Sequence, residues 1–353
     1  VGAGGWRSVF WFNLALGSVL LVAAIRYVPN SSDPQPGRLD VGGFLFGAVM
    51  LGSLIFAGIS GEQYGYGTGW IIALFVLSGL SLLALIAVER HVRSPMIDAR
   101  YLKAPQVSSA LFVAFAVYFG IFSIFFFTAL YLDLVVGYSG WQMAGVFAPM
   151  AAAIVIGSLV AGRWVANVGT RLPMMCGCAL SSVGILLTRH DLTIAPSFDG
   201  LLISLGLAGL GFGIAVVPLT AAVLGYVPAA RSGMAASATN TARQLGAVIG
   251  VAALGGLVTN HLTSDFGASL SSSGITGGGK NFILKMLETG GQGAAGIDIA
   301  HPSPIIKPLV DSATAAFRGG LHAALLVSAV LILVSAGVIA LVPRSSLAPD
   351  SEY

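Results

Sequence analysis

The sequence predicts an all-α integral membrane protein that crosses a lipid bilayer nine times. Hydrophobic residues make up 56% of the chain and charged residues only 9%, whereas a soluble domain carries roughly 25% charged residues. Nine stretches are each apolar over the length of about 20 residues that a membrane-spanning helix requires. The Lys and Arg residues fall almost entirely in alternate connections, which is the charge pattern of loops on the cytoplasmic side.

The predicted spans follow one another through short connections, with one long connection before the last span. The 47 glycines of the chain fit helices that approach one another through small residues. Cys176 and Cys178 lie two residues apart, on different sides of one predicted helix. We therefore expect them to be small core residues, with neither a disulfide nor a metal site. The spans are predicted near 6–27, 41–59, 70–88, 107–135, 141–162, 172–188, 199–225, 234–258 and 319–342.

Non-spanning segments divide the chain into regions. Segments rich in Pro, Ser and charged residues isolate a two-helix transmembrane hairpin, 41–88, which we interpret as a spacer. Residues 308–320 predict a helix that leads into the last span. The regions are a first span at 1–27, a linker plus hairpin at 28–106, a six-helix bundle at 107–342 with an outer loop at 260–317, and a cytoplasmic tail at 343–353.

The start of the chain is unusual for a membrane protein. The basic residues place Val1 outside the cell and Tyr353 inside. Val1 is not an initiator methionine, and no signal peptide precedes the first span. We therefore expect that an N-terminal portion is absent from this sequence.

Six stretches, in order along the chain, resemble the later part of a fourteen-span drug:proton antiporter of the major facilitator superfamily, of the EmrB/QacA type. Each stretch alone is a weak signal, but six stretches in the same order as in the family are a strong signal. They are GWRSVFWFNLALG at 5–17, ERHVRSPMIDARYL at 89–102, the segment 131–171 that begins YLDLVVGYSGWQ, GLGFGIAVVPLTAAV at 209–223, SATNTARQLGAVIGVAALG at 237–255 and AFRGGLHAALLVSAV at 316–330.

The resemblance implies an arrangement for each region. Residues 1–27 would be the sixth family span, which is the last span of the N-terminal bundle. The hairpin 41–88 would be the extra pair of spans of the fourteen-span branch, and residues 107–342 would be the C-terminal bundle. The first five spans, which the family requires for activity, would be missing.

One predicted helix carries a face of aromatic residues that ends in a carboxylate. Tyr118, Phe122, Phe125 and Asp133 recur at helical spacing. This face can hold a lipophilic cation through stacking and cation–π attraction. Alternatively Asp133, near the end of its helix, lies at the outer rim in water, and we favour this interpretation because ionisable groups deep in lipid are rare. The family resemblance points the same way, because the family usually has a glutamine here.

Arg243 lies about two turns inside a predicted span, with Asn240 and Gln244 beside it. A guanidinium in the membrane must face protein or a water-filled cavity. This polar face is either part of a substrate pathway or a helix-packing site at the cytoplasmic end, and the sequence leaves both open. In the preceding span, Gly209, Gly211, Gly213 and Pro218 are candidates for a helix that flexes, with tight packing as the alternative.

The predicted function is proton-coupled efflux of lipophilic or amphiphilic compounds, including cationic ones, by alternating access. Multidrug export and antibiotic resistance follow from the family resemblance. Alternatives are transport of a lipid or another endogenous amphiphile, or a non-transporting membrane scaffold. The spans carry no catalytic constellation, so we expect no enzyme, no cofactor and no metal. The predicted partners are membrane lipids, small substrates, protons and the missing N-terminal helices, with no nucleic acid, in a multi-pass protein of the plasma or inner membrane.

Overall fold

The computed structural model describes residues 5, 7–28, 40–91, 99–193, 196–228, 231–261, 264 and 307–342. The chain divides into two compact units, Val1–Leu39 and Asp40–Tyr353. The first unit contains helix α1 (Arg7–Tyr27), which buries none of its side chains. The second unit contains the other helices that the structure describes.

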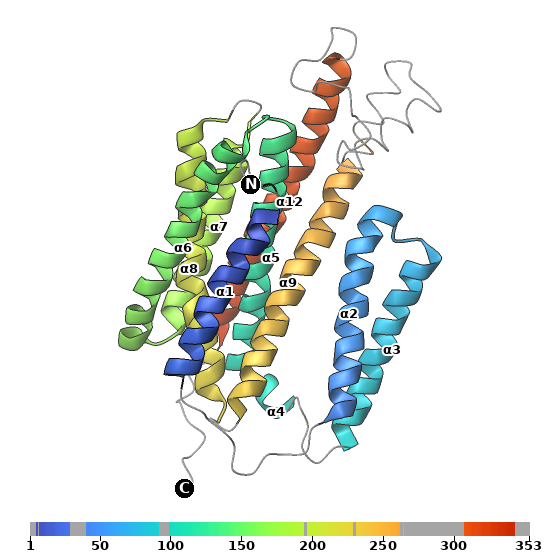
Figure 1. The fold of residues 1–353 in the computed structure, drawn as a ribbon, viewed down its shortest axis with the longest axis vertical. Helices are drawn as coiled ribbons and strands as arrows, with labels where there is room; N and C mark the ends of the chain where they lie inside the picture. Colours follow the sequence, from blue (N-terminus) through green and yellow to red (C-terminus); the bar gives the residue numbers. More distant parts are fainter. Residues whose placement is uncertain are drawn as a thin grey trace. The chain divides into compact units, whose positions relative to one another are not determined.

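Every predicted span is confirmed as a helix of membrane-crossing length within the described residues. These residues contain no β-strand, so the all-α fold class is confirmed for them. An apolar helix of this length satisfies its own backbone hydrogen bonds, which lipid cannot do. The helices of the second unit are α2 (Val41–Tyr64), α3 (Gly69–His91), α4 (Ala99–Leu102), α5 (Pro105–Leu134), α6 (Gly140–Val168), α7 (Arg171–Asp191), α8 (Phe198–Tyr226), α9 (Ser232–His261) and α12 (Lys307–Leu341), as Figure 1 shows.

The last helix is longer than the last predicted span. Helix α12 begins at Lys307, twelve residues before the span predicted at 319–342, because the segment 308–320 continues the helix as expected. The predicted outer loop 260–317 therefore ends in helical structure. Most of that loop, the linker around 29–39 and the tail 343–353 lie outside the described residues.

Local sequence signals set several helix boundaries. The Asp40 carboxylate accepts a hydrogen bond from the Gly43 backbone N–H at 2.7 Å and caps α2. Ser139 and Gln142 form a reciprocal capping box at the start of α6. Gly169 ends that helix with a φ of 79°, a left-handed conformation that glycine adopts without steric cost.

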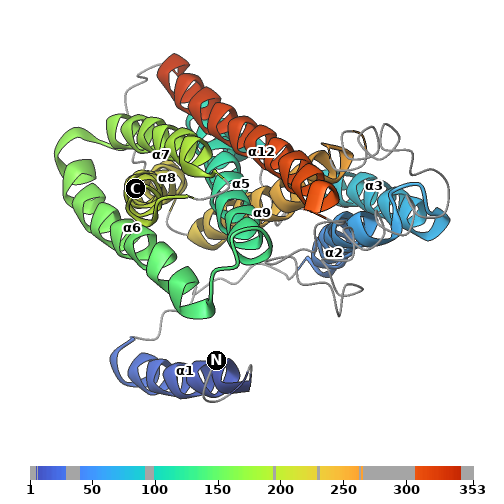
Figure 2. The ribbon, with the colours of Figure 1, turned by 90° about the horizontal axis from the view of Figure 1, so that it is seen from above.

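The bundle is built around α5 and α8. Helix α8 packs against α6, α7 and α5, whereas α5 also packs against α9 and α12. Seen from above, α6 and α9 lie on opposite sides of α5 (Figure 2). The hairpin α2–α3 is attached to the bundle through contacts of α2 with α9. This arrangement leaves one face of α5 between α6 and α9.

Glycines let α8 approach its neighbours at backbone contact. A Cβ on Gly213 would overlap the carbonyl oxygen of Ile154 in α6, and one on Gly209 would overlap that of Met150. A Cβ on Gly211 would overlap the backbone nitrogen of Ser181 in α7. These close approaches support tight helix packing, the alternative to flexing that we gave for these glycines. Helix α8 runs without interruption through Pro218, and its flexing stays a prediction.

In lipid, the hydrophobic effect does not drive helices together, so hydrogen bonds between helices contribute to their association. The Ser328 hydroxyl of α12 donates to the Ser123 hydroxyl of α5 at 3.0 Å. At one end of the bundle, the Tyr131 hydroxyl donates to the carbonyl of Thr193 at 3.0 Å. His322 Nε2 lies 3.1 Å from the Leu192 carbonyl, so the turn after α7 is held by both α5 and α12. Both cysteines are free, and Cys178 is buried.

Candidate functional site

The aromatic face of α5 lies between α6 and α9. Tyr118 and Phe125 are half-buried and Phe122 is 45% exposed, whereas Val117 and Phe127 of the same helix are buried. Phe125 stacks on Phe147 of α6, with ring centroids 5.0 Å apart. Tyr118 instead contacts α9. Phe122 lies one turn from each of them, on the same face of α5.

Arg243 is held where α5, α8 and α9 meet. Its Nη2 donates a hydrogen bond to Thr220 Oγ1 of α8 at 2.6 Å. Its guanidinium carbon lies 5.3 Å from the centroid of the Tyr118 ring, within the range of a cation–π interaction. The Thr220 hydroxyl donates to the Val216 carbonyl at 3.1 Å, so its oxygen lone pairs remain available to the arginine. The structure thus brings together two residues that the sequence selected separately, Tyr118 and Arg243.

The polar surface around Arg243 continues along α9. Asn240 and Gln244 are both exposed, and their spacing of four residues places them on the same helix face. Asn240 is also three residues from Arg243. The amide groups of these side chains supply hydrogen-bond donors and acceptors beside the guanidinium. Because the cation is fixed and the amides are accessible, this surface can bind a polar group of a ligand.

Asp133 lies apart from this cluster. It is exposed and is the second-last residue of α5. Fifteen residues separate it from Tyr118, which corresponds to about 22 Å along a helix. Its carboxylate therefore does not neutralise Arg243. Its location at the outer rim of the membrane stays a prediction.

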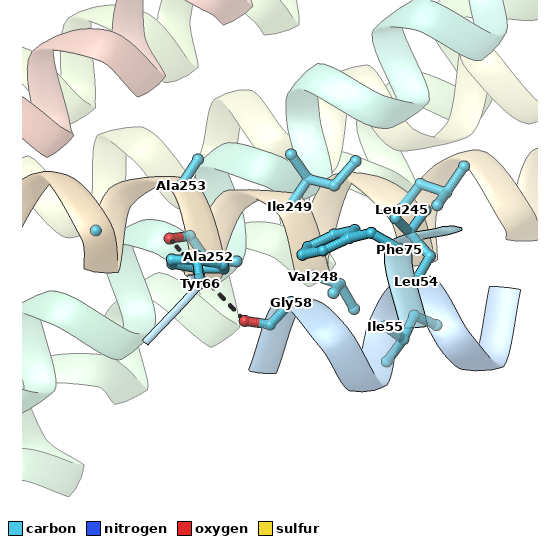
Figure 3. A pocket seen from close by; sticks show the side chains of 11 residues that line it. Leu54, Ile55, Gly58, Tyr66, Phe75, Leu245, Val248, Ile249, Ala252 and Ala253 are labelled. Atoms are coloured by element: carbon cyan, nitrogen blue, oxygen red, sulfur yellow. Dashed lines mark hydrogen bonds between the residues drawn. The ribbon is translucent and has the colours of Figure 1, made fainter. Parts of the chain in front are cut away.

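A separate apolar pocket lies between the hairpin and α9. It has a volume of about 350 Å³ and is lined mainly by aliphatic side chains of α2 and α9, with Phe75 from α3. Tyr66, from the turn between α2 and α3, directs its hydroxyl at the carbonyl of Gly58 at 3.2 Å and that of Ala252 at 3.5 Å (Figure 3). The hydroxyl thereby links the hairpin to α9.

The pocket and the arginine use opposite faces of α9. Leu245 and Ala252 line the pocket, and at 100° per residue they lie about 200° and 180° around the helix from Arg243. Helix α9 therefore has a polar face toward α5 and α8 and an apolar face toward the hairpin. That the hairpin contributes little to a substrate cavity stays a prediction.

Three contributors to these sites were not predicted from the sequence. Thr220 is one of a few hydroxyl residues in an apolar helix, which is a weak signal by itself. Phe147 and Tyr66 carry no local signal for their partners, because each contacts a residue on another helix. Among the described residues, no group of three His, Cys, Asp or Glu side chains could hold a metal ion.

Comparison with known proteins places these features in a family context. A family model of the Major Facilitator Superfamily matches residues 1–251. A solved bacterial homolog of the human lysosomal transporter Spinster, in an inward-facing and occupied conformation, superposes with a TM-score of 0.52 at 16% identity. The superposition covers 85% of this chain and 64% of that one. This likeness concerns the fold alone.

Curated relatives include several drug efflux proteins. The chain is 29% identical over 343 residues to the multidrug efflux pump LfrA of Mycolicibacterium smegmatis, covering 95% of this chain and 64% of LfrA. It is 30% identical over 267 residues to the drug efflux pump JefA of Mycobacterium tuberculosis, covering 73% of this chain and 51% of JefA. Over 260 residues it is 28% identical to the multidrug resistance protein Stp of Mycobacterium tuberculosis, covering 74% of this chain and 48% of Stp. The matched regions thus span between about half and two thirds of these relatives.

Proposed function

The chain belongs to the Major Facilitator Superfamily, and from this premise we propose that it forms the later spans of a fourteen-span, proton-coupled exporter of lipophilic or amphiphilic compounds. The nine membrane-length helices among its described residues make it a multi-pass membrane protein. The named efflux function of its relatives supports the drug-export part of the proposal. The proposal also includes alternating access, in which two bundles rock about a site between them.

The observation that carries this proposal is the aromatic face of α5 with Arg243 at its edge. Ionisable groups inside membrane spans are rare and usually line substrate or ion pathways. Here the guanidinium lies beside Tyr118, and the exposed Phe122 ring follows one turn along α5. Apolar walls with a few fixed polar groups are typical of small-molecule sites. An amphiphile would place its apolar part on the aromatic rings and its polar part at α9.

The complete pathway needs a second bundle in this proposal. The relatives extend well beyond the matched region, in agreement with spans that precede α1 in the full protein. The hairpin α2–α3 corresponds to the extra pair of spans of the fourteen-span branch. Its attachment to the apolar face of α9, away from Arg243, supports a peripheral role.

Cellular accumulation of the neutral lipophilic dye Nile red tests the proposal. The 353-residue chain and the protein from its complete coding sequence are expressed in a bacterium that lacks its major efflux pumps. We expect the complete protein to lower dye accumulation, a protonophore to abolish this effect, and the 353-residue chain alone to have none. Unchanged accumulation with the complete protein, at confirmed membrane abundance, would argue against the proposed export.

Asp133→Asn in the complete protein is expected to leave proton-driven export in place. An exposed charge contributes at most about 1 kcal/mol to a local interaction, so export should change less than about fivefold. Asp199→Asn, at an exposed acid in the first turn of α8, is the matched control. Complete loss of proton-driven export only in Asp133→Asn, at normal abundance, would instead identify Asp133 as a coupling carboxylate.

A second candidate function is the transport of a lipid or another endogenous amphiphile. The apolar pocket beside the hairpin favours it, because an acyl chain fits an apolar space of about 350 Å³ that opens between membrane helices. Inhibition of dye export by an added lysophospholipid, with saturable competition, would support this candidate over general drug export.

A further inference from the structure

The charge embedded in the described spans is positive and lacks a counter-ion there. Arg243 follows the start of α9 by eleven residues, or about 16 Å along the helix. Its side chain is always charged, because a guanidinium is not deprotonated in proteins. Its hydrogen-bonded neighbour among the described residues, Thr220, is neutral, and its ring neighbour Tyr118 provides only a π face. Neither partner balances a full positive charge.

The hydrogen-bonding capacity of the guanidinium is also incompletely used. It has five N–H donors, and among the described residues one hydrogen bond is formed, from Nη2 to Thr220. Its Nε is buried and has no partner in this part of the chain. A cation that is partly desolvated without an anion is strongly destabilising. The site is therefore built to accept a negatively charged group.

The described acidic residues do not supply that group. Asp133 lies about 22 Å further along α5 than Tyr118, the residue that contacts Arg243. Every other acidic residue that the structure describes lies at or near a helix end, away from the middle of a span. They are Asp40, Glu62, Glu89, Asp191, Asp199 and Asp311.

We propose that Arg243, with Thr220 and the neighbouring amides of Asn240 and Gln244, binds the acidic group of an amphiphilic substrate. A carboxylate accepts two parallel hydrogen bonds from a guanidinium, which adds direction to the charge attraction. The apolar part of the same molecule lies along the aromatic face of α5, on Phe122. This inference rests on the proposed export function and specifies its substrate class as anionic amphiphiles.

Transport of three matched probes tests the inference. Pyrenebutyrate carries a carboxylate, its methyl ester is neutral, and a pyrenebutyl-trimethylammonium analogue is cationic. The protein from the complete coding sequence is reconstituted in liposomes with an imposed pH gradient, and initial rates give KM and kcat for each probe. We expect the KM for pyrenebutyrate to be about tenfold lower than for the ester, the effect of one charged hydrogen-bonded contact.

Variants separate recognition from folding. Arg243→Gln should remove the preference for pyrenebutyrate while leaving the KM for the ester unchanged, and Arg243→Lys should restore part of the preference. Arg163→Gln removes an exposed cation near the end of α6 and serves as the control. The ratio of KM values between probes is unaffected by the amount of folded protein.

The outcomes distinguish the inference from the function on which it rests. Preferential transport of the neutral or cationic probe, insensitive to Arg243→Gln, would overturn the anion site and leave export standing. An equal loss of transport for all three probes in Arg243→Gln would also overturn it, since this result indicates a structural role or pairing with a carboxylate of the preceding spans. Absence of proton-driven transport for every probe would refute both the inference and the proposed export.

Discussion

Gly213→Ala is expected to destabilise the bundle, although alanine is the better helix former. The new Cβ would overlap the carbonyl oxygen of Ile154, a backbone atom that cannot rotate away. Helices α6 and α8 would have to separate along their contact. Overpacking of this kind costs about 1–3 kcal/mol, which exceeds the gain of about 1 kcal/mol in helix propensity. The apparent melting temperature of the detergent-solubilised protein should therefore fall.

The same helix offers a matched control. A Cβ on Gly206 of α8 would meet no atom within 4 Å, so Gly206→Ala gains helix propensity without a clash. We expect its melting temperature to be unchanged or slightly raised. If Gly213→Ala proves as stable as Gly206→Ala, the close approach of α6 and α8 is not a feature of the folded protein. If its stability is unchanged but export is lost, flexing of α8 becomes the better explanation of these glycines.

The positions of the helices were predictable because lipid imposes a strong constraint on sequence. A span must be long and apolar, and this requirement is local. Helix α12 begins before the predicted span 319–342 and continues through Asp311 and Arg318, as the helix predicted at 308–320 led us to expect. The capping residue Ser139 of α6 shows that boundaries in polar loops follow the same rules as in soluble proteins.

The partners of the site residues were less predictable than the residues themselves. Arg243 is recognisable from the sequence because a charge inside an apolar span is costly and therefore needs an explanation. Its partner Thr220 is not, because a hydroxyl can satisfy itself within its own helix, as the bond to Val216 shows. Which helices lie side by side depends on tertiary packing. The contact of α9 with both α5 and α8 has no local sequence signature.

Removing the Thr220 hydroxyl alone is expected to destabilise the protein more than removing the Thr220 hydroxyl and the Arg243 guanidinium together. Thr220→Val keeps the shape of the side chain but leaves Nη2 of Arg243 without its acceptor, and Nε already has no partner among the described residues. The cost of leaving a charged donor unpaired is about 2 kcal/mol. Thr220→Ser retains a hydroxyl and should remain close to the wild-type stability. The comparison is made on melting temperatures and membrane abundance of the complete protein.

The double variant Thr220→Val/Arg243→Met completes the cycle. Replacing both partners of a buried polar pair by apolar groups of similar size is often neutral, so stability should return to within about 1 kcal/mol of the wild type. Export of the anionic probe pyrenebutyrate should nevertheless be low, because the embedded positive charge is gone. Recovery of stability without export indicates that Arg243 is retained for transport rather than for folding. A double variant less stable than Thr220→Val would indicate the reverse, with the cation–π contact to Tyr118 holding α5 and α9 together.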